Sequence, residues 1–217
     1  MRFNGVDPGL TILSYGTRQK TKKIYDEYGS IPNTSVEYFI DNEEYIGYER
    51  EMIFLIKNEE ELRTAFELFN GAGKLEVGDG GYYKARVIET EHEFISRDRT
   101  MSQFIVTFRI APFFWIESSN ITITPPGIVY NSGYKSYPLI RVYGTGDLTV
   151  TINGRATVLL GVDEYIDLDS ELRIAYKGTI NQGEKLISDF PFFDSGKNTV
   201  SADGASSLGI TPRWREL

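Results

Sequence analysis

The sequence predicts a mainly β protein with two domains and a single short helix. Short apolar segments with an alternating pattern recur along the chain and are separated by turn-forming residues. The 217 residues include 21 glycines and 13% aromatic residues, a composition that favours strands joined by tight turns. Only one stretch has helical periodicity. The length allows one large β domain or two domains of about 100 residues, and either can bury a core.

The N-terminal half is predicted to consist of strands and loops on both sides of the helix. The segments that are apolar enough for strands are residues 11–15, 35–40, 51–56, 82–88 and 104–110. A polar, lysine-rich loop is expected at residues 18–23 and an acidic turn at residues 41–44. Together with the helix, these strands predict a sandwich-like or barrel-like β domain.

The predicted helix covers about residues 59–69. Asn58 is a suitable N-cap, and the three glutamates that follow it place negative charge where the helix dipole favours it. An apolar stripe at spacings of three and four residues comes next: Leu62, Ala65, Phe66 and Phe69. Gly71 tolerates the positive φ that commonly ends a helix. A helix this short needs a sheet to pack on.

A boundary between two domains is expected near residue 116, giving domains 1–116 and 117–217. The aromatic segment 111–115 ends the first part, and the polar segment 117–120 opens the second. Such a change in composition is typical of a linker between domains.

The C-terminal part has the most regular strand pattern. Alternating or short apolar segments lie at residues 140–143, 148–152, 156–160, 165–169, 198–200 and 208–210. A turn is expected at the Gly-Thr-Gly of residues 144–146. Asn153-Gly154 is the strongest hairpin signal, because both residues accept the positive φ of a type I′ turn. This spacing of strands and turns predicts a β-sandwich or jelly roll.

The composition argues against several classes of function. The net charge is −8, and both halves are acidic on balance, so neither has the basic face that phosphate binding requires. A negative net charge keeps a protein soluble. Because DNA is negative too, such a protein would not hold a DNA molecule that slides past it. The absence of Cys excludes disulfides and thiolate metal sites, and it fits folding in a reducing cytosol. No apolar run is long enough to span a membrane, and the first eight residues lack the apolar region of a signal peptide.

No catalytic, cofactor-binding or metal-binding residues are predicted. His92 is the only histidine, and its charged surroundings at residues 89–93 contain no nucleophile motif. The glycine pairs at residues 71–73 and 144–146 are not followed by the helix N-terminus that a phosphate loop needs.

Two kinds of binding surface stay open. The acidic residues Asp163, Glu164, Asp167 and Asp169 could bind Ca²⁺, but they lack the order of an EF-hand loop. Asp167 and Asp169 would share one face of a strand, which suits a solvated sheet surface. The 14 tyrosines and two tryptophans permit sugar-stacking platforms, although aromatic residues in strands more often belong to a core or an interface.

Several segments, taken in order, resemble the distal tail protein (Dit) family of siphophages and their prophage relatives. In the N-terminal half they are residues 49–56, 61–66, 69–75, 82–86 and 108–113. In the C-terminal half they are residues 144–146, 152–154, 166–172, 189–191, 196–198 and 212–217. No single segment is specific, but their order and spacing are, and they extend over nearly the whole chain.

The resemblance implies a structural virion protein and no enzyme. It implies that residues 1–116 form a hexameric ring around a channel for DNA, and that residues 117–217 form a galectin-like jelly-roll β-sandwich at the periphery. Such a ring joins the tail tube to the baseplate or tip. Its implied partners are the tail tube protein, a tail-associated lysin or fibre protein, and the tape measure protein. The implied location is the distal end of the virion tail, after synthesis in the bacterial cytoplasm, with no cofactor, no specific nucleic-acid binding and no membrane association.

An alternative function is a carbohydrate-binding module for attachment to the host cell wall, and a hydrolase is a third. The chain is too short for the carbohydrate-binding modules inserted in some members of the family. The paired His and Arg of galectin sugar sites have no counterpart in it. Ring formation needs interfaces that close, and sheet edges or residues 113–115 are the candidates for them.

Overall fold

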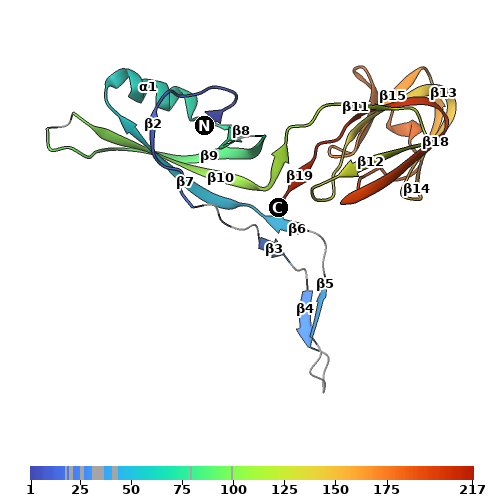
Figure 1. Ribbon diagram of the computed structural model, residues 1–217, viewed down its shortest axis with the longest axis horizontal. Coiled ribbons are helices and arrows are strands. Elements are labelled where there is room, and N and C mark those ends of the chain that lie inside the picture. Colours follow the sequence, from blue (N-terminus) through green and yellow to red (C-terminus); the bar gives the residue numbers. More distant parts are fainter. Residues whose placement is uncertain are drawn as a thin grey trace. The chain divides into compact units, whose positions relative to one another are not determined.

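The computed structural model describes residues 1–217 apart from residues 18, 20, 21, 25, 26, 31–36, 41–43, 79 and 99. The chain divides into two compact units, Met1–Phe114 with Leu217, and Trp115–Glu216. Both units consist mainly of strands, and α1 is the only α-helix among the described residues (Figure 1). The predicted fold class, mainly β with one short helix, is confirmed.

The first unit is built on one curled sheet with the strand order β1-β8-β9-β10-β7-β2. The bounds of these strands are Arg2–Phe3 for β1, Thr11–Ser14 for β2, Tyr48–Ile56 for β7, Ala72–Glu76 for β8, Gly81–Phe94 for β9 and Ser102–Ile116 for β10. In the centre of the sheet, Phe104 lies opposite Phe54 and Val106 opposite Met52. Alternate residues of β7 and β10 are therefore buried on one face.

The core of the first unit lies between this face and α1 (Glu59–Leu68), and it is rich in aromatic rings. Phe69, directly after α1, has its ring centroid 4.9 Å from that of Phe54 and 6.0 Å from that of Phe108. The rest of this core combines further aromatic residues with apolar non-aromatic ones: Phe3, Tyr48, Met52, Ile56, Ala65, Leu75, Tyr83, Ala85, Phe104, Val106 and Ile110. Phe66 is half exposed, but its ring meets that of Phe104 edge-on at 4.8 Å.

The helix begins as the sequence predicts. Asn58 has an extended backbone, and its Oδ1 accepts a hydrogen bond from the Glu61 amide at 2.8 Å. Glu61 Oε2 accepts one in return from the Lys57 amide at 2.9 Å. These two bonds satisfy backbone donors that a helix N-terminus otherwise leaves unpaired. Gly71 has a φ of 71°, as expected after the helix end.

Two short ladders lie between β2 and β7 in the sequence. β3 (Lys22–Ile24) pairs with β6 (Glu44–Ile46), and β4 (Glu27–Ser30) pairs with β5 (Glu37–Ile40), both antiparallel. The predicted strand at residues 35–40 is confirmed over β5, and its first two residues lie outside the described ones. The predicted loop at residues 18–23 is wrong at its end, because Lys22 begins β3. The acidic turn at residues 41–44 lies outside the described residues except for Glu44, which begins β6.

In the second unit, one hydrogen-bonded sheet folds over on itself. Its main order is β11-β18-β13-β15-β16-β17, while β12 pairs with another part of β18 and β14 with another part of β13. The bounds are Ile121–Ile123 for β11, Gly127–Asn131 for β12, Leu139–Ile152 for β13, Arg155–Val162 for β14, Tyr165–Asp169 for β15, Ile174–Lys177 for β16, Ile180–Asn181 for β17 and Gly196–Thr211 for β18. A short 3₁₀-helix, η1 (Gly183–Lys185), follows β17, and β19 (Arg215–Glu216) pairs with β10.

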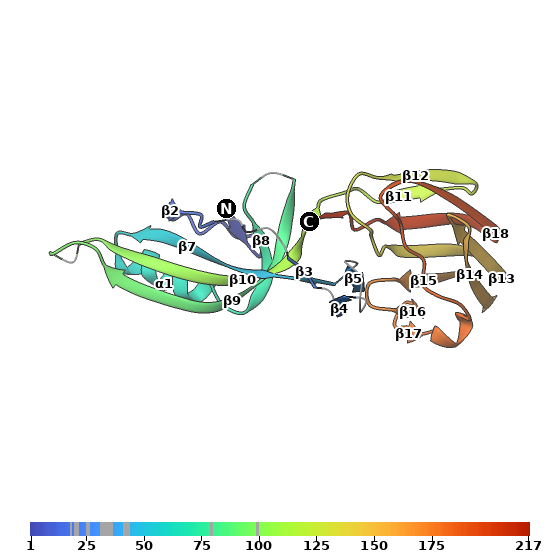
Figure 2. The same ribbon diagram turned by 90° about the horizontal axis from the view of Figure 1, so that it is seen from below.

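The two longest strands connect the layers of this unit. The first half of β13 pairs with β15 and its second half with β14, with register shifts in between (Figure 2). The turn predicted at residues 144–146 is therefore wrong, because these residues continue β13 through a bend. A Cβ on Gly144 would lie 2.9 Å from the Gly204 carbonyl oxygen, and Gly204 has a φ of 76°. Glycines are needed here because β13 and β18 cross closely while they bend.

The core of the second unit is mostly aliphatic and lies between these layers. Its members come from both halves of the long strands and from their partners: Val129, Ile140, Val142, Leu148, Val150, Ile152, Leu159, Val162, Ile166, Leu168, Ala175, Phe193, Val200, Leu208, Ile210 and Trp214. The Asn153-Gly154 hairpin is confirmed: the two residues have φ of 50° and 79° and join β13 to β14. The likeness of this unit to galectins stays a prediction.

Candidate functional site

The residues weighed for catalysis or metal binding are not brought together. His92 lies on β9 with its ring against that of Phe94, and its buried Nε2 has no hydrogen-bond partner. Among the described residues, no group of three or more His, Cys, Asp or Glu side chains is placed to hold a metal ion. In the same part of the chain, no helix is long and apolar enough to cross a membrane.

The acidic residues of the predicted Ca²⁺ alternative are held instead by basic side chains. Asp163 and Glu164 accept hydrogen bonds from Lys177 Nζ at 3.0 and 3.2 Å. Asp167 and Asp169 do share one face of β15, but each residue is only 3% exposed. The predicted solvated surface is therefore wrong, because arginines cover both carboxylates.

Two bidentate ion pairs form this cover. Arg141 Nε and Nη2 donate to the two carboxylate oxygens of Asp167 at 2.7 and 2.8 Å. Arg213 Nη1 and Nη2 donate to those of Asp169 at 2.6 and 2.7 Å. Burial alone would raise the pKa of Asp169, but the hydrogen bonds from Arg213 and the Leu172 amide hold it below its ordinary value. The hydrogen bonds to Asp167 raise the pKa of Arg141.

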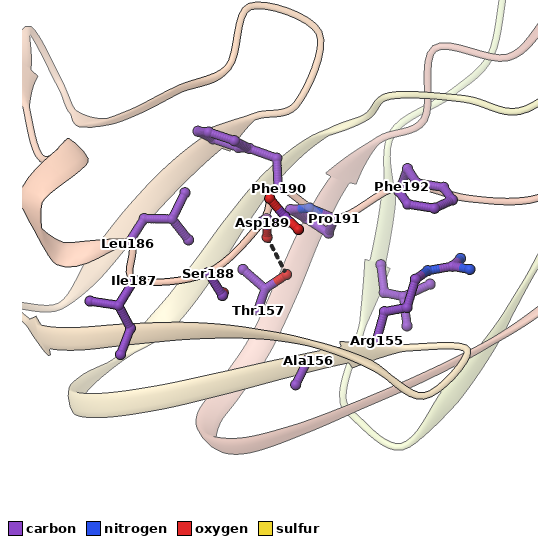
Figure 3. A pocket seen from close by; sticks show the side chains of 11 residues that line it. Arg155, Ala156, Thr157, Leu186, Ile187, Ser188, Asp189, Phe190, Pro191 and Phe192 are labelled. Atoms are coloured by element: carbon purple, nitrogen blue, oxygen red, sulfur yellow. Dashed lines mark hydrogen bonds between the residues drawn. The ribbon is translucent and has the colours of Figure 1, made fainter. Parts of the chain in front are cut away.

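A cleft of about 670 Å³ opens beside β14. It lies between the start of β14 and residues 186–192, and its lining is Ile152, Arg155, Ala156, Thr157, Leu186, Ile187, Ser188, Asp189, Phe190, Pro191 and Phe192. Figure 3 shows Arg155 and Phe192 together on one side of it and Leu186 and Ile187 on the other. Thr157 Oγ1 donates to the Asp189 carbonyl at 3.1 Å, and the Val158 amide donates to Ser188 Oγ at 2.7 Å, so the segment is fixed to β14.

A polar network supports the Arg155 side of the cleft. Arg155 Nη2 donates to Asp194 Oδ2 at 2.6 Å, and its guanidinium carbon lies 3.9 Å from the centroid of the Phe192 ring. The side-chain Nδ2 of Asn153 also donates to Asp194 Oδ2, at 3.0 Å. Desolvation opposes the ionised form of Asp194, but these hydrogen bonds and the nearby charge of Lys135 lower its pKa. The network fixes the hairpin turn, and the residues that form it do not include a nucleophile with a base beside it.

In the first unit, the features that suit binding are the edges of the sheet. Among the described residues, β2 pairs only with β7 and β1 only with β8, so each ends the sheet on one side. Leu13, at the register shift of β2, is 50% exposed. The segment 113–115 does not form an open surface, because Phe114 packs against the core of the first unit and Trp115 is 7% exposed.

Comparisons with known proteins give a match only at the level of structure. No protein-family model matches the chain, and no curated protein does either. The crystal structure of the phage SPP1 Dit protein has 14% sequence identity and a TM-score of 0.68, and the alignment covers 99% of this chain and 96% of that one. The chain has the Dit fold. The SPP1 Dit protein is described as a paradigm of the hub adsorption apparatus of phages that infect Gram-positive bacteria.

Two structures of the phage p2 baseplate in its activated conformation also align with the chain. The structure with Sr has 8% identity and a TM-score of 0.46, with 88% of this chain and 86% of that one covered. The structure with Ca has 9% identity and a TM-score of 0.46, with 100% and 90% covered. At this level of similarity we draw nothing from these two.

Proposed function

We propose that the chain is a structural protein of a phage tail, the distal hub that forms a hexameric ring between the tail tube and the baseplate or tip. The observation that supports this most is the SPP1 Dit likeness, which extends over both units and nearly the full length of both chains. A shared fold does not by itself carry a shared function. Here, however, the order of the sequence segments and the fold point to the same family independently.

The open edges of the first unit support ring formation by this unit, residues 1–116. A sheet edge presents unpaired backbone donors and acceptors that favour pairing with another chain. Because β1 and β2 lie at opposite ends of the sheet, they offer two different surfaces. Two different surfaces are what a heterologous, closing ring needs. Residues 117–217 then form the peripheral domain.

The charge and the chemistry of the chain fit a conduit for DNA. A net charge of −8 repels the DNA backbone and so lets it pass without being held. The partners that follow from this role are the tail tube protein, a tail-associated lysin or fibre protein, and the tape measure protein. The location is the distal end of the virion tail.

Leu13→Lys tests the ring interface. A lysine on an edge strand disfavours strand pairing between chains, so we expect the assembled form to dissociate or weaken while the fold is kept. Mass photometry of the protein, alone or mixed with the tail tube protein, should show particles that contain six 24.6 kDa chains for the wild type and mainly monomer for the variant.

The matched control is Leu172→Lys, which places the same charge on a 64% exposed leucine of the second unit. It should leave the assembled mass unchanged. Equal effects of the two substitutions would contradict a ring held by the β2 edge.

A further inference from the structure

A polar hollow of about 330 Å³ lies on the face of the second unit's sheet opposite its core, and it shares no lining residue with the cleft of Figure 3. Its lining is Asn120, Ile121, Thr122, Leu139, Arg141, Tyr143, Asp167, Gly209, Ile210 and Thr211. The strand register explains why they meet. Thr122 lies opposite Gly209, Gly209 opposite Arg141, and Arg141 opposite Asp167, so one row crosses β11, β18, β13 and β15.

Gly209 is the one residue of this row without a side chain, and it lies between Thr122 and Arg141. The backbone does not require a glycine there. Its φ is not positive, and a Cβ would meet only Tyr143 at 3.7 Å and Arg141 at 3.8 Å, which is ordinary contact. Gly144 and Gly204 differ, because a side chain at either would collide with the crossing strand. A glycine inside a strand weakens it and often marks the close approach of a ligand. The missing side chain at Gly209 therefore leaves room that the chain does not use.

The walls of the hollow carry both hydrogen-bond donors and acceptors. The Arg141 side chain is 43% exposed and binds Asp167 through only two of its three guanidinium nitrogens. Thr211 Oγ1 donates to Asn120 Oδ1 at 2.9 Å, which leaves the Asn120 amide nitrogen as a donor. The Thr122 hydroxyl is both donor and acceptor. A hollow lined in this way suits a ligand with several hydroxyl groups.

An aromatic ring lies beside these polar groups. Tyr143 is 38% exposed, and its ring centroid is 6.3 Å from that of Tyr165. The Arg141 guanidinium lies 4.5 Å from the Tyr165 centroid, so this tyrosine is covered while Tyr143 remains accessible. The Tyr143 hydroxyl interacts with Arg141, so what the accessible tyrosine offers a ligand is the apolar face of its ring.

The charges of the face favour a neutral ligand. Each of its three basic side chains is already paired with one or two carboxylates: Arg141 with Asp167, Lys177 with Asp163 and Glu164, and Arg213 with Asp169 and Glu171. An anion would meet an arginine that is already neutralised, with further carboxylates close by. A cation would meet a carboxylate whose oxygens are both bound to Arg141.

From these observations we infer that the hollow over Gly209 is a binding site for a neutral saccharide. The sugar ring packs on Tyr143, its hydroxyls bond to Arg141, Asn120 and Thr122, and one edge fills the space above Gly209. All residues of the site belong to the second unit, and none of them lies on the sheet edges of the first unit that the proposed ring uses.

The test uses the full-length protein on an array of neutral mono- and oligosaccharides, followed by calorimetric titration with the best binder. Gly209→Ala adds one methyl group to the floor of the hollow and should weaken binding about tenfold. Tyr143→Ala, at an exposed position, should weaken it by a similar factor. Gly127→Ala is the matched control, because its Cβ would also meet only ordinary contact, at 3.7 Å from Ile123, outside the hollow.

The inference is overturned if no neutral saccharide on the array gives saturable binding. It is equally overturned if Gly209→Ala and Gly127→Ala bind a saccharide alike, since the sugar then sits elsewhere. Thermal unfolding of each variant shows whether it folds. If Gly209→Ala does not fold, the test rests on Tyr143→Ala: weaker saccharide binding supports the site, and unchanged binding overturns it.

Discussion

The two units of this protein reach a folded state by different means. The first packs one sheet and a helix around a cluster of phenylalanine rings, and it leaves β1 and β2 as edges among its described strands. The second folds a single sheet over a mostly aliphatic core, and on its outer face two arginines cover buried aspartates. Among the described strands, the first unit therefore has two edges at which a strand of another chain could pair. On the outer face of the second unit, by contrast, the charged groups are already in ion pairs, and hydrogen-bonding groups remain exposed.

Phe69→Ala should have the largest effect, and it should act on the first unit alone. The Phe69 ring lies within 6.2 Å, centroid to centroid, of four other phenylalanine rings. Removing it should lower the free energy of unfolding of this unit by about 3–5 kcal/mol. Both tryptophans, Trp115 and Trp214, belong to the second unit, so their fluorescence in a urea titration should keep its midpoint.

Far-UV circular dichroism, to which the helix of the first unit contributes, should show that the Phe69→Ala variant unfolds at a lower urea concentration. Phe94→Ala, at a 54% exposed ring, is the control and should cost little. A shift of the tryptophan signal as large as that of the dichroism would contradict independent units.

Arg213→Met should have the next largest effect, this time on the second unit. It leaves the Asp169 carboxylate, whose side chain is 4% exposed, without its main partner. Breaking a buried pair in this way should cost about 2–4 kcal/mol, measured by tryptophan fluorescence in urea. Arg155→Met is the matched change at an exposed pair, in which both side chains are 44% exposed, and should cost about 1 kcal/mol or less. Equal costs would mean that burial does not distinguish the two pairs.

The pH dependence of the second unit should follow from the same pair. Because the pKa of folded Asp169 is below its ordinary value, its ionisation stabilises the folded state above the unfolded pKa of about 3.9. This stability is lost as the pH falls through the folded pKa. The urea midpoint from tryptophan fluorescence should therefore be level between about pH 7 and pH 5 and fall below that. Asp169→Asn should make the urea midpoint fall less steeply with decreasing pH. Some of the fall should remain, because the pKa of Asp194 is lowered too. If the pH dependence of the midpoint does not change in this variant, the Asp169–Arg213 pair does not cause it.

The smallest effect should come from the helix cap of the first unit. Asn58→Ala removes the acceptor for the Glu61 amide and should cost about 1 kcal/mol of the dichroism-monitored stability. Asn58→Asp keeps an acceptor at the same place and should cost much less. Similar losses for both variants would mean that the cap does not act through this hydrogen bond.

Local signals were enough for some elements and not for others. The helix after Asn58 and the hairpin at Asn153 were predictable, because the deciding residues are neighbours in sequence. Two glycines close together fit both a turn and a bend within a strand, so the sequence alone predicts a turn at residues 144–146 where β13 continues. Only the pairing of β13 with β14, β15 and β18 distinguishes the two.

The candidate sites were even less accessible to sequence reasoning. Arg141 meets Asp167 and Gly209 only because strands far apart in the chain pair in a particular register. That register depends on packing across the whole sheet, and no short motif encodes it. The Arg155 side of the cleft is similar, because Phe192 and Asp194 reach β14 from a distant segment.

The central claim, that the first unit closes into a ring, is tested most directly by negative-stain electron microscopy of the purified protein. We expect six-fold rings with a central hole, either from the chain alone or after addition of the tail tube protein. Particles of monomer size at high concentration, both with and without the tube protein, would contradict it.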